Sequence, residues 1–315
     1  MVKDYKQLLT NTRANISKFI HHTPVLTSSA LNKIAGTSLY FKCENFQRMG
    51  AFKMRGAINA VFHLTEEEKK YGVVTHSSGN FAQALSLAAK TFKIPAYIVM
   101  PENAPQVKKE AVRSYGGNIT ECLPTQTARE HTASQIAKEK QATFIHPSND
   151  LNVILGNATA TLELLEEYSD LDVVITPVGG GGLIAGTALA AFYFGNNCMT
   201  YGGEPFAVDD AYRSLLSGKI EINSSMETIA DGLKTTLGTI NFPLIQKYVT
   251  DIFRVEEEEI IKAMQLIWQR MKIIIEPSCA VPFAAIVKHK EVFKNKKVGV
   301  ILSGGNVDLT NLPFN

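Results

Sequence analysis

The sequence predicts an α/β protein built on parallel sheets, and two stretches of regular alternation carry this prediction. Within residues 71–150, short apolar runs alternate with helical stretches. A second alternation starts at Leu151 and ends with the apolar run 298–302. Strands that alternate with helices are typical of βαβ units, in which the strands are parallel. We therefore expect two α/β blocks.

Each predicted element has a local reason. Apolar residues at helical spacing between Tyr5 and Ile20 predict an amphipathic helix, which ends at the His21-His22-Thr23-Pro24 break. Thr65 and Glu68 have the spacing of a capping box and open a short charged helix. The predicted strands are 38–43, 73–75, 96–100, 119–122, 143–146, 172–178, 199–202, 252–255 and 298–302. The remaining predicted helices are 53–64, 81–92, 106–115, 128–140, 154–168, 183–194, 256–271 and 280–289.

Length and composition set the scale of the molecule. A chain of 315 residues with 45% hydrophobic residues exceeds the size at which a single core usually suffices. We expect two domains. Residues 71–150 form a small domain inserted into a large one, which consists of residues 1–70 and 151–315.

Charge and cysteine content exclude some classes of protein. The net charge of +2 comes from interspersed charges, so neither a nucleic-acid partner nor a membrane surface is expected. The four cysteines are widely spaced and show no metal-binding pattern. The N-terminus lacks the apolar region of a signal peptide. These features favour a cytoplasmic protein.

Lys53 is the strongest candidate for a reactive group. It stands in Ala51-Phe52-Lys53-Met54-Arg55-Gly56-Ala57, at the start of a predicted helix. Partial burial would lower the pKa of its amine and make the neutral, nucleophilic form available. The alternative is a solvated surface lysine, which is common at helix starts.

Four glycines, Gly179, Gly180, Gly181 and Gly182, connect a buried strand to a helix. Free backbone amides and the positive end of a helix favour an anion such as phosphate. Neither a dinucleotide-binding pattern nor a P-loop is present, so a small phosphorylated cofactor is the better match. A flexible turn is the alternative.

Three further polar stretches follow predicted elements: 76–80, 276–278 and 303–306. Each could be ordinary turn chemistry. Ligands bind outside the carboxyl ends of strands in open parallel sheets, so the joint placement of these stretches indicates a shared pocket.

Together these motifs resemble the fold-type II pyridoxal-phosphate enzymes, in the branch of the serine racemases and serine/threonine dehydratases, with the serine racemases the most similar. The resemblance rests on Ala-Phe-Lys-x-Arg-Gly-Ala, Ser-Ser-Gly-Asn, the tetraglycine and Ser-Gly-Gly-Asn, in this order, and it covers essentially the whole chain. It implies two open, twisted, mostly parallel sheets flanked by helices. It also implies pyridoxal 5'-phosphate as cofactor and a homodimer.

The resemblance also assigns roles to single residues. Lys53 would bind the cofactor aldehyde and Ser78 would exchange a proton on the opposite face of the substrate. The carboxylate of the amino-acid substrate would lie at Ser77, Ser78, Gly79 and Asn80, with Arg129 near the site. Other cofactor contacts would come from Phe52, from Asn80 to the 3-hydroxyl, from Gly179, Gly180, Gly181 and Gly182 to the phosphate, and from Ser303 to the pyridine nitrogen.

A divalent cation is implied by the loop that carries Glu204 and Asp210, with the carbonyl of Val208 as a third ligand. Oxygen ligands favour magnesium, calcium or manganese. Without the resemblance, a solvated acidic loop would be the simpler interpretation.

Three positions depart from the family pattern. Phe81 stands where histidine is usual, Ala51 where serine is often found, and Ser148 where asparagine is usual. Phe81 would add apolar bulk beside the carboxylate loop, which bears on substrate preference.

The implied reaction is dehydration of serine, threonine or a related β-hydroxy amino acid to an α-keto acid and ammonia, with racemisation. One alternative is β-replacement of the cysteine-synthase type. Another is a catalytically silent ligand-binding protein on the same fold, which intact Lys53 and the tetraglycine argue against. The sequence leaves the preferred amino acid, the cation and any nucleotide activation open.

Overall fold

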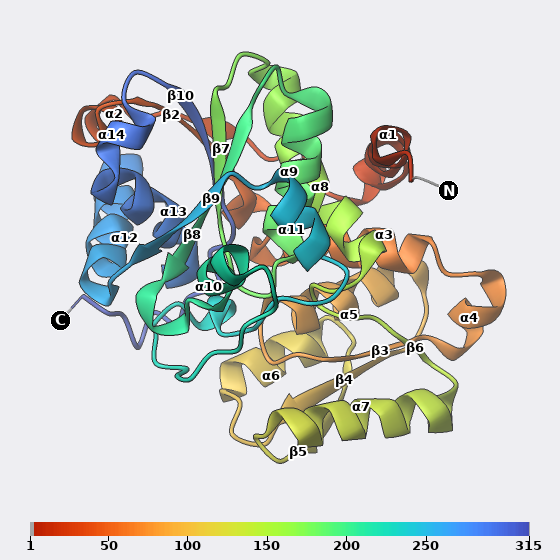
Figure 1. The fold of residues 1–315 in the computed structure, drawn as a ribbon. Coiled ribbons are helices and arrows are strands. Elements are labelled where there is room, and N and C mark those ends of the chain that lie inside the picture. The colour runs from red at the N-terminus through yellow and green to blue at the C-terminus, as the bar shows by residue number, and fades with distance from the viewer. Residues whose placement is uncertain (1–2, 315) are drawn as a thin grey trace.

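The framework of the protein is a pair of sheets, seen in a computed structural model that describes residues 3–314 (Figure 1). The larger sheet consists of β1 (Val25–Leu26), β2 (Ser38–Cys43), β7 (Val173–Pro177), β8 (Met199–Pro205), β9 (Asp251–Val255) and β10 (Lys297–Leu302). Within residues 3–314 the order of these strands is β1-β2-β10-β7-β8-β9. All pairs are parallel except β1 with β2 at one edge.

The smaller sheet is entirely parallel and has the order β5-β4-β3-β6. Its strands are β3 (Val73–His76), β4 (Ala96–Pro101), β5 (Asn118–Cys122) and β6 (Thr143–Phe144). Its helices are α5 (Asn80–Phe92), α6 (Gln106–Ser114) and α7 (Gln126–Lys140). Alternate residues of the strands point to opposite faces, so Val73 and Ile98 pack with α5 while Val74 and Val99 pack with α7.

Helices cover both faces of the larger sheet (Figure 1). α2, α12 and α13 share one hydrophobic cluster with the sheet, and α1, α8, α9 and α11 share clusters on the other face. The bounds are α1 Tyr5–Ile16, α2 Ser29–Ala35, α3 Lys53–Phe62, α4 Glu66–Tyr71, α8 Leu151–Glu167, α9 Gly182–Phe194, α10 Asp210–Ser217, α11 Phe242–Tyr248, α12 Glu257–Met271, α13 Pro277–Lys288 and α14 Lys290–Phe293. Short 3₁₀ turns are η1 Ser17–Phe19, η2 Glu44–Phe46, η3 Arg48–Gly50, η4 Phe206–Val208 and η5 Asp231–Leu233.

The predicted fold class is confirmed, whereas several element ends differ from the prediction. α1 ends at Ile16 and a 3₁₀ turn continues it to Phe19. α13 begins at Pro277 rather than Ala280, because proline fits the first turn of a helix, where no N–H is needed. The predicted capping box is present, since Thr65 and Glu68 each bond the other's backbone N–H.

The small sheet is formed by residues within the predicted insertion 71–150. Its core does not stop at those limits, because Met54 and Ile58 of α3 join Phe81 and Leu85 of α5 in one hydrophobic cluster. The division at residues 70 and 150 stays a prediction. Among residues 3–314, every helix is too short or too polar to cross a bilayer.

Candidate active site

Lys53 is the first residue of α3, and backbone contacts hold this helix start against the end of β10. Phe52 N–H donates to the carbonyl of Ser303 at 3.0 Å. Ala51 forms an antiparallel bridge with Gly304. The lysine is therefore placed at the carboxyl end of a central strand, where open parallel sheets bind ligands.

The surroundings of Lys53 favour its neutral form. Its Nζ donates to the carbonyl of Pro147 at 2.9 Å and lies 5.0 Å from the ring of Phe52 and 5.8 Å from that of Phe81. Burial lowers the pKa of Lys53 to about 8, and the charge of Glu276 opposes this shift. A useful fraction of the amine is therefore nucleophilic near neutral pH.

Gly179, Gly180 and Gly181 lie between β7 and α9, Gly182 is the first residue of α9, and Ser148 lies beside this loop. A Cβ atom added to Gly180 would approach Ser148 Oγ to 2.4 Å, and Gly181 has φ +78°, so side chains are excluded from the loop. Within residues 3–314, no hydrogen bond donated by the four glycine N–H groups is found. These free amides at the N-terminus of α9 suit an anion. Since Ser148 follows Pro147, the loop adjoins the lysine.

Glu276, which the sequence indicates only as part of a polar turn, belongs to the site. Both of its carboxylate oxygens accept from Asn80 Nδ2 at 3.0 Å, and Asn306 Nδ2 donates to Asn80 Oδ1 at 2.8 Å. Burial raises the pKa of Glu276 to about 7, and repulsion by Asp231 adds to this. An acidic residue directly before a proline at a helix start was the available signal.

The loop after β3 lies next to this network, because it ends at Asn80. Ser77 N–H donates to the carbonyl of Val99 at 3.1 Å, and Gly79 N–H donates to Ser77 Oγ at 3.4 Å. Ser78 lies between them and is partly exposed. The predicted contacts of this loop with a carboxylate stay a prediction.

Ser303 lies next to Lys53, whereas Arg129 lies on a helix of the small sheet. Ser303 is buried next to Lys53, through the contact of its carbonyl with Phe52. Arg129 lies in the first turns of α7, and its charge lowers the pKa of His76, although burial is the larger cause. No hydrogen bond joins Arg129 to Lys53 or Asn80, and its Nε has no partner in the described part of the chain.

The predicted cation ligands Glu204, Val208 and Asp210 lie at the end of β8, in η4 and at the start of α10. Glu204 accepts from the backbone N–H groups of Ala211 and Tyr212 at 3.1 and 2.9 Å. Burial raises the pKa of Glu204 well above its ordinary value, and the charge of Asp210 adds to this. Within residues 3–314, no group of three or more His, Cys, Asp or Glu side chains could hold a metal, so this site would depend on two carboxylates and a carbonyl.

This acidic loop is connected to the glycine loop. Asp210 Oδ2 accepts from Leu237 N–H at 3.2 Å. A Cβ atom added to Gly181 would lie 2.7 Å from Leu237 Cδ2, so Leu237 packs directly on the tetraglycine. A cation at the loop would therefore stabilise the segment that covers the proposed phosphate site.

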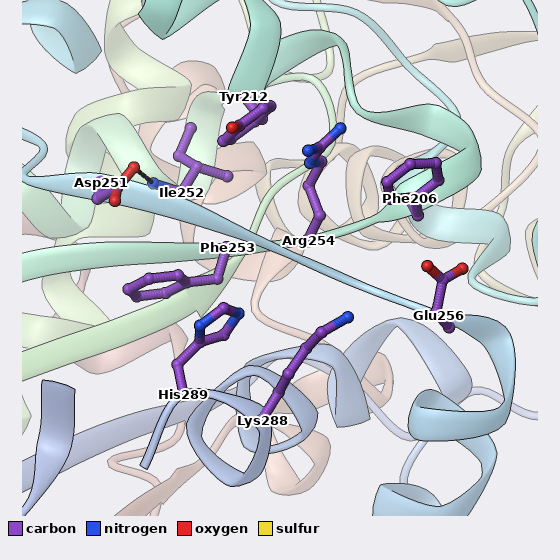
Figure 2. Close-up of a pocket in the computed structure, with 9 residues that line it drawn as sticks. All are labelled: Phe206, Tyr212, Asp251, Ile252, Phe253, Arg254, Glu256, Lys288 and His289. Atoms are coloured by element: carbon purple, nitrogen blue, oxygen red, sulfur yellow. Dashed lines mark hydrogen bonds between the residues drawn. The ribbon is translucent and has the colours of Figure 1, made fainter. Parts of the chain in front are cut away.

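A separate cavity of about 360 Å³ lies along the edge strand β9 (Figure 2). Arg254 lines it, with its guanidinium 4.6 Å from the ring of Phe206 and 4.0 Å from that of Tyr212. None of the predicted site residues lines this cavity. Phe206 nevertheless belongs to the acidic loop and Tyr212 follows it by two residues, so the cavity borders that loop.

A half-buried amine beside an anion-binding glycine loop, at the carboxyl ends of parallel strands, defines a class of protein. It is the class of α/β enzymes in which an amine and a loop of backbone amides together suit a phosphorylated aldehyde. The half-buried lysine and the free amides fit pyridoxal phosphate, which carries both an aldehyde and a phosphate.

Comparison with known proteins agrees with this class. Residues 16–304 match the family described as pyridoxal-phosphate dependent enzyme, and the chain belongs to this family. It is 50% identical to serine racemase of Dictyostelium discoideum over 317 residues, which cover 99% of this chain and 96% of the relative. It is 46% identical to β-hydroxyaspartate dehydratase of Paracoccus denitrificans over 314 residues, which cover 100% and 99%. The structure of maize serine racemase matches it with a TM-score of 0.95. The two sequences are 41% identical, and the match covers 96% of this chain and 94% of the maize chain. The predicted family and fold-type II architecture are confirmed.

Proposed function

We propose that the protein uses pyridoxal phosphate to dehydrate a β-hydroxy amino acid of the serine or threonine type to an α-keto acid and ammonia, and that it also interconverts the enantiomers. The observation that carries the proposal is Lys53, whose pKa is lowered to about 8 beside four free glycine amides. The family match and the similarity to serine racemases support it.

The proposal assigns a task to each residue of the site. Pyridoxal phosphate, when bound, supplies an aldehyde and an electron-withdrawing ring that stabilises negative charge at the α-carbon of an amino acid. Lys53 would hold this aldehyde and move the α-proton on one face of the substrate, and Ser78 would move it on the other. The amides of Gly179, Gly180, Gly181 and Gly182 would hold the phosphate.

The other predicted contacts complete the site. Asn80 would bond the 3-oxygen of the cofactor and Phe52 would lie against it, while Ser303 would face the ring nitrogen. The substrate carboxylate would bind at Ser77, Ser78, Gly79 and Asn80, with Arg129 nearby. A hydroxyl such as that of Ser303 does not enforce a protonated ring nitrogen, unlike a carboxylate.

The first test replaces Lys53 and follows both products. L- and D-serine, threonine and 3-hydroxyaspartate are supplied separately, and keto acid and enantiomer are measured for each. In Lys53→Ala both activities should be lost, since the amine that bonds the cofactor is also a proton-transfer group. Turnover of L-serine near the wild-type rate would refute the proposal. The panel also decides between serine and hydroxyaspartate, the substrate class in the name of the Paracoccus relative.

Ser78 allows racemisation to be separated from dehydration. In Ser78→Ala, Lys53 still removes the proton of an L-substrate, so L-serine should still yield keto acid, while racemisation and D-serine dehydration are lost. A general acid or base contributes on the order of 10²- to 10⁴-fold, so the loss would be large. Equal falls for both enantiomers would show that Ser78 only positions the substrate.

We also propose that Glu204, Asp210 and the carbonyl of Val208 bind a divalent cation such as magnesium, calcium or manganese. Two buried carboxylates that lack a cationic partner, and whose pKa values are raised, support this. The enzyme would act as a homodimer in the cytoplasm. All four cysteines are free, which is compatible with a reducing compartment.

A further inference from the structure

Glu276 is a buried carboxylate that the proposed chemistry leaves without a task. It occupies the N-cap position of α13 without a capping bond from its side chain, and its N–H donates to the carbonyl of Gly304 at 3.1 Å. Its side chain lies against the same strand end that holds Lys53, because a Cβ atom added to Gly304 would be 3.0 Å from Glu276 Oε1 and 3.1 Å from the Cβ of Ala51. No ion pair of Glu276 is found within residues 3–314. An unpaired buried carboxylate is costly and calls for a reason.

The contact with Asn80 fixes the orientation of that amide. Both oxygens of Glu276 accept from Asn80 Nδ2, and a carboxylate can only accept, so the NH₂ end of Asn80 must face it. The other end is fixed as well, since Asn306 Nδ2 donates to Asn80 Oδ1 and to the carbonyl of Met49 at 2.9 Å. Glu276 and Asn306 together therefore fix the orientation of the Asn80 amide.

The charged groups around Glu276 come from several elements. The charge of Glu276 raises the pKa of Lys53 in α3. The charge of Asp231 in η5 raises the pKa of Glu276, and that of Lys108 in α6, which pairs with Asp231, lowers it. Cys279 of α13, one turn further, has its pKa raised mainly by burial and also by Glu276. Among these groups, only Lys53 is both cationic and part of the proposed chemistry.

We propose that Glu276 is a positioning residue that controls the protonation of Lys53 electrostatically and orients the amide of Asn80. When Glu276 is ionised, it favours the ammonium form of Lys53, so the lysine retains a proton that it can return to the substrate. This inference rests on the proposed function, because it assumes that Lys53 is the lysine that bonds the cofactor.

The two groups titrate in neighbouring ranges. Burial lowers the pKa of Lys53 to about 8 and raises that of Glu276 to about 7. As pH rises through neutrality, Glu276 loses its proton first, and its new charge then resists deprotonation of Lys53. Such coupled groups titrate together, so the lysine should respond over a wider pH range than an isolated amine.

The test measures how readily Lys53 captures the cofactor. The full chain is freed of pyridoxal phosphate, and the rate at which the visible band returns on adding it is followed against pH. Capture needs the neutral amine, so the midpoint reports the pKa of Lys53. In Glu276→Gln the midpoint should fall by about one pH unit, because one nearby opposite charge has an effect of this size, and capture at neutral pH should be several-fold faster.

Matched variants separate the possible outcomes. Glu258→Gln, which removes an exposed carboxylate from α12, should leave the midpoint unchanged, and Glu276→Asp should restore it. After borohydride reduction and unfolding, Lys53→Ala should retain no covalently bound cofactor, whereas the wild type should retain it. If that variant is labelled to the wild-type level, the proposed function itself is wrong. If it is not, and Glu276→Gln keeps the wild-type midpoint, only the inference about Glu276 is overturned.

A measurement on the unaltered sequence covers the case in which Glu276→Gln does not fold. Lysines of the cofactor-free chain are methylated with ¹³C-formaldehyde, and the Lys53 signal is identified by its absence in Lys53→Ala. Its titration should show a second inflection near pH 7, where Glu276 ionises. A single inflection would contradict the coupling.

Discussion

Two groups of buried charged side chains in this protein differ in whether their carboxylates have cationic partners. The first, here the charge cluster, consists of Lys42, Glu44, Arg55 and Glu163. The second, the carboxylate pair, consists of Glu204 and Asp210. All six side chains belong to fully buried residues. The cluster combines two cations with two anions, whereas the pair has two anions and no cation in contact.

Direct ion pairs complete the charge cluster. Arg55 contacts both Glu44 and Glu163 at 2.7 Å, and Lys42 contacts Glu163 at 2.8 Å. Burial alone would raise the pKa of Glu163, but bonds and charges from Arg55 and Lys42 outweigh it and lower that pKa to about 2. The cluster joins α3, two residues after Lys53, to β2 and α8. It therefore needs no ligand.

The carboxylate pair is only partly compensated. Asp210 accepts from Asn223 Nδ2 at 2.6 Å and from Leu237 N–H, but these are neutral donors. Burial raises the pKa of Asp210 to about 6 despite them. The comparison shows that burial of charge does not by itself identify a binding site. The missing countercharge does, and here it favours a cation.

The largest expected effect comes from breaking the charge cluster. Arg55→Leu leaves Glu44 buried without an ion pair and Glu163 without its closest one, and should lower the free energy of unfolding by about 3–5 kcal/mol. Urea unfolding followed by circular dichroism measures this. Arg13→Leu is the control, because Arg13 contacts Glu163 at a longer 3.6 Å and is partly exposed, so its loss should cost at most about 1 kcal/mol. Similar losses in both variants would contradict the comparison.

The two groups should also respond to pH with opposite signs. Without cation, Asp210 destabilises the folded state as pH rises from about 4 to about 6, because its folded pKa lies above its ordinary value of 3.8. The effect is roughly 3 kcal/mol. Glu163 has a lowered pKa, so its contribution is present above pH 4.5 and is lost as pH falls through about 2.

Asp210→Asn isolates the first of these pH effects. Its free energy of unfolding minus that of the wild type, both in chelator, should increase between about pH 4 and pH 7 by roughly 3 kcal/mol. Urea unfolding at the two pH values provides the difference. No change in this difference would show that Asp210 is not destabilised by its ionisation.

A somewhat smaller effect is expected from the cation itself. Removing it with a chelator should lower the melting temperature, and magnesium or calcium at about 100 times its dissociation constant should restore about 2.7 kcal/mol. In the double variant Glu204→Gln, Asp210→Asn this response should vanish, while Glu227→Gln, an exposed carboxylate, should keep it. A wild-type protein that ignores chelation and holds no metal by elemental analysis would exclude the site.

The sequence predicted the framework because its signals are local. Apolar runs such as Val173–Pro177 predict buried strands, and a lysine or four glycines at an element end remain visible without any partner. The stretch 276–278 was predicted to join the pocket, but the role of Glu276 was not, because it depends on a contact with Asn80, 196 positions away. The charge cluster was missed for the same reason, since Lys42, Arg55 and Glu163 have the composition of solvated residues until the fold brings them together.

The smallest expected effect concerns Arg254, which lines the cavity along β9 (Figure 2). Arg254 Nη1 contacts Asp209 at 2.9 Å, and its guanidinium lies over the rings of Phe206 and Tyr212. Arg254→Lys keeps the charge near Asp209 but loses the planar stacking, so it should cost about 0.5–1 kcal/mol in urea unfolding. Because the charge is retained, affinity for the cation should not change, as measured by calorimetric titration. Arg254→Gln exposes the charge of Asp209, which already adds to the repulsion on Glu204, so it should bind the cation more tightly at low salt. Equal affinities in both variants would show that the pair is insensitive to the charges next to it.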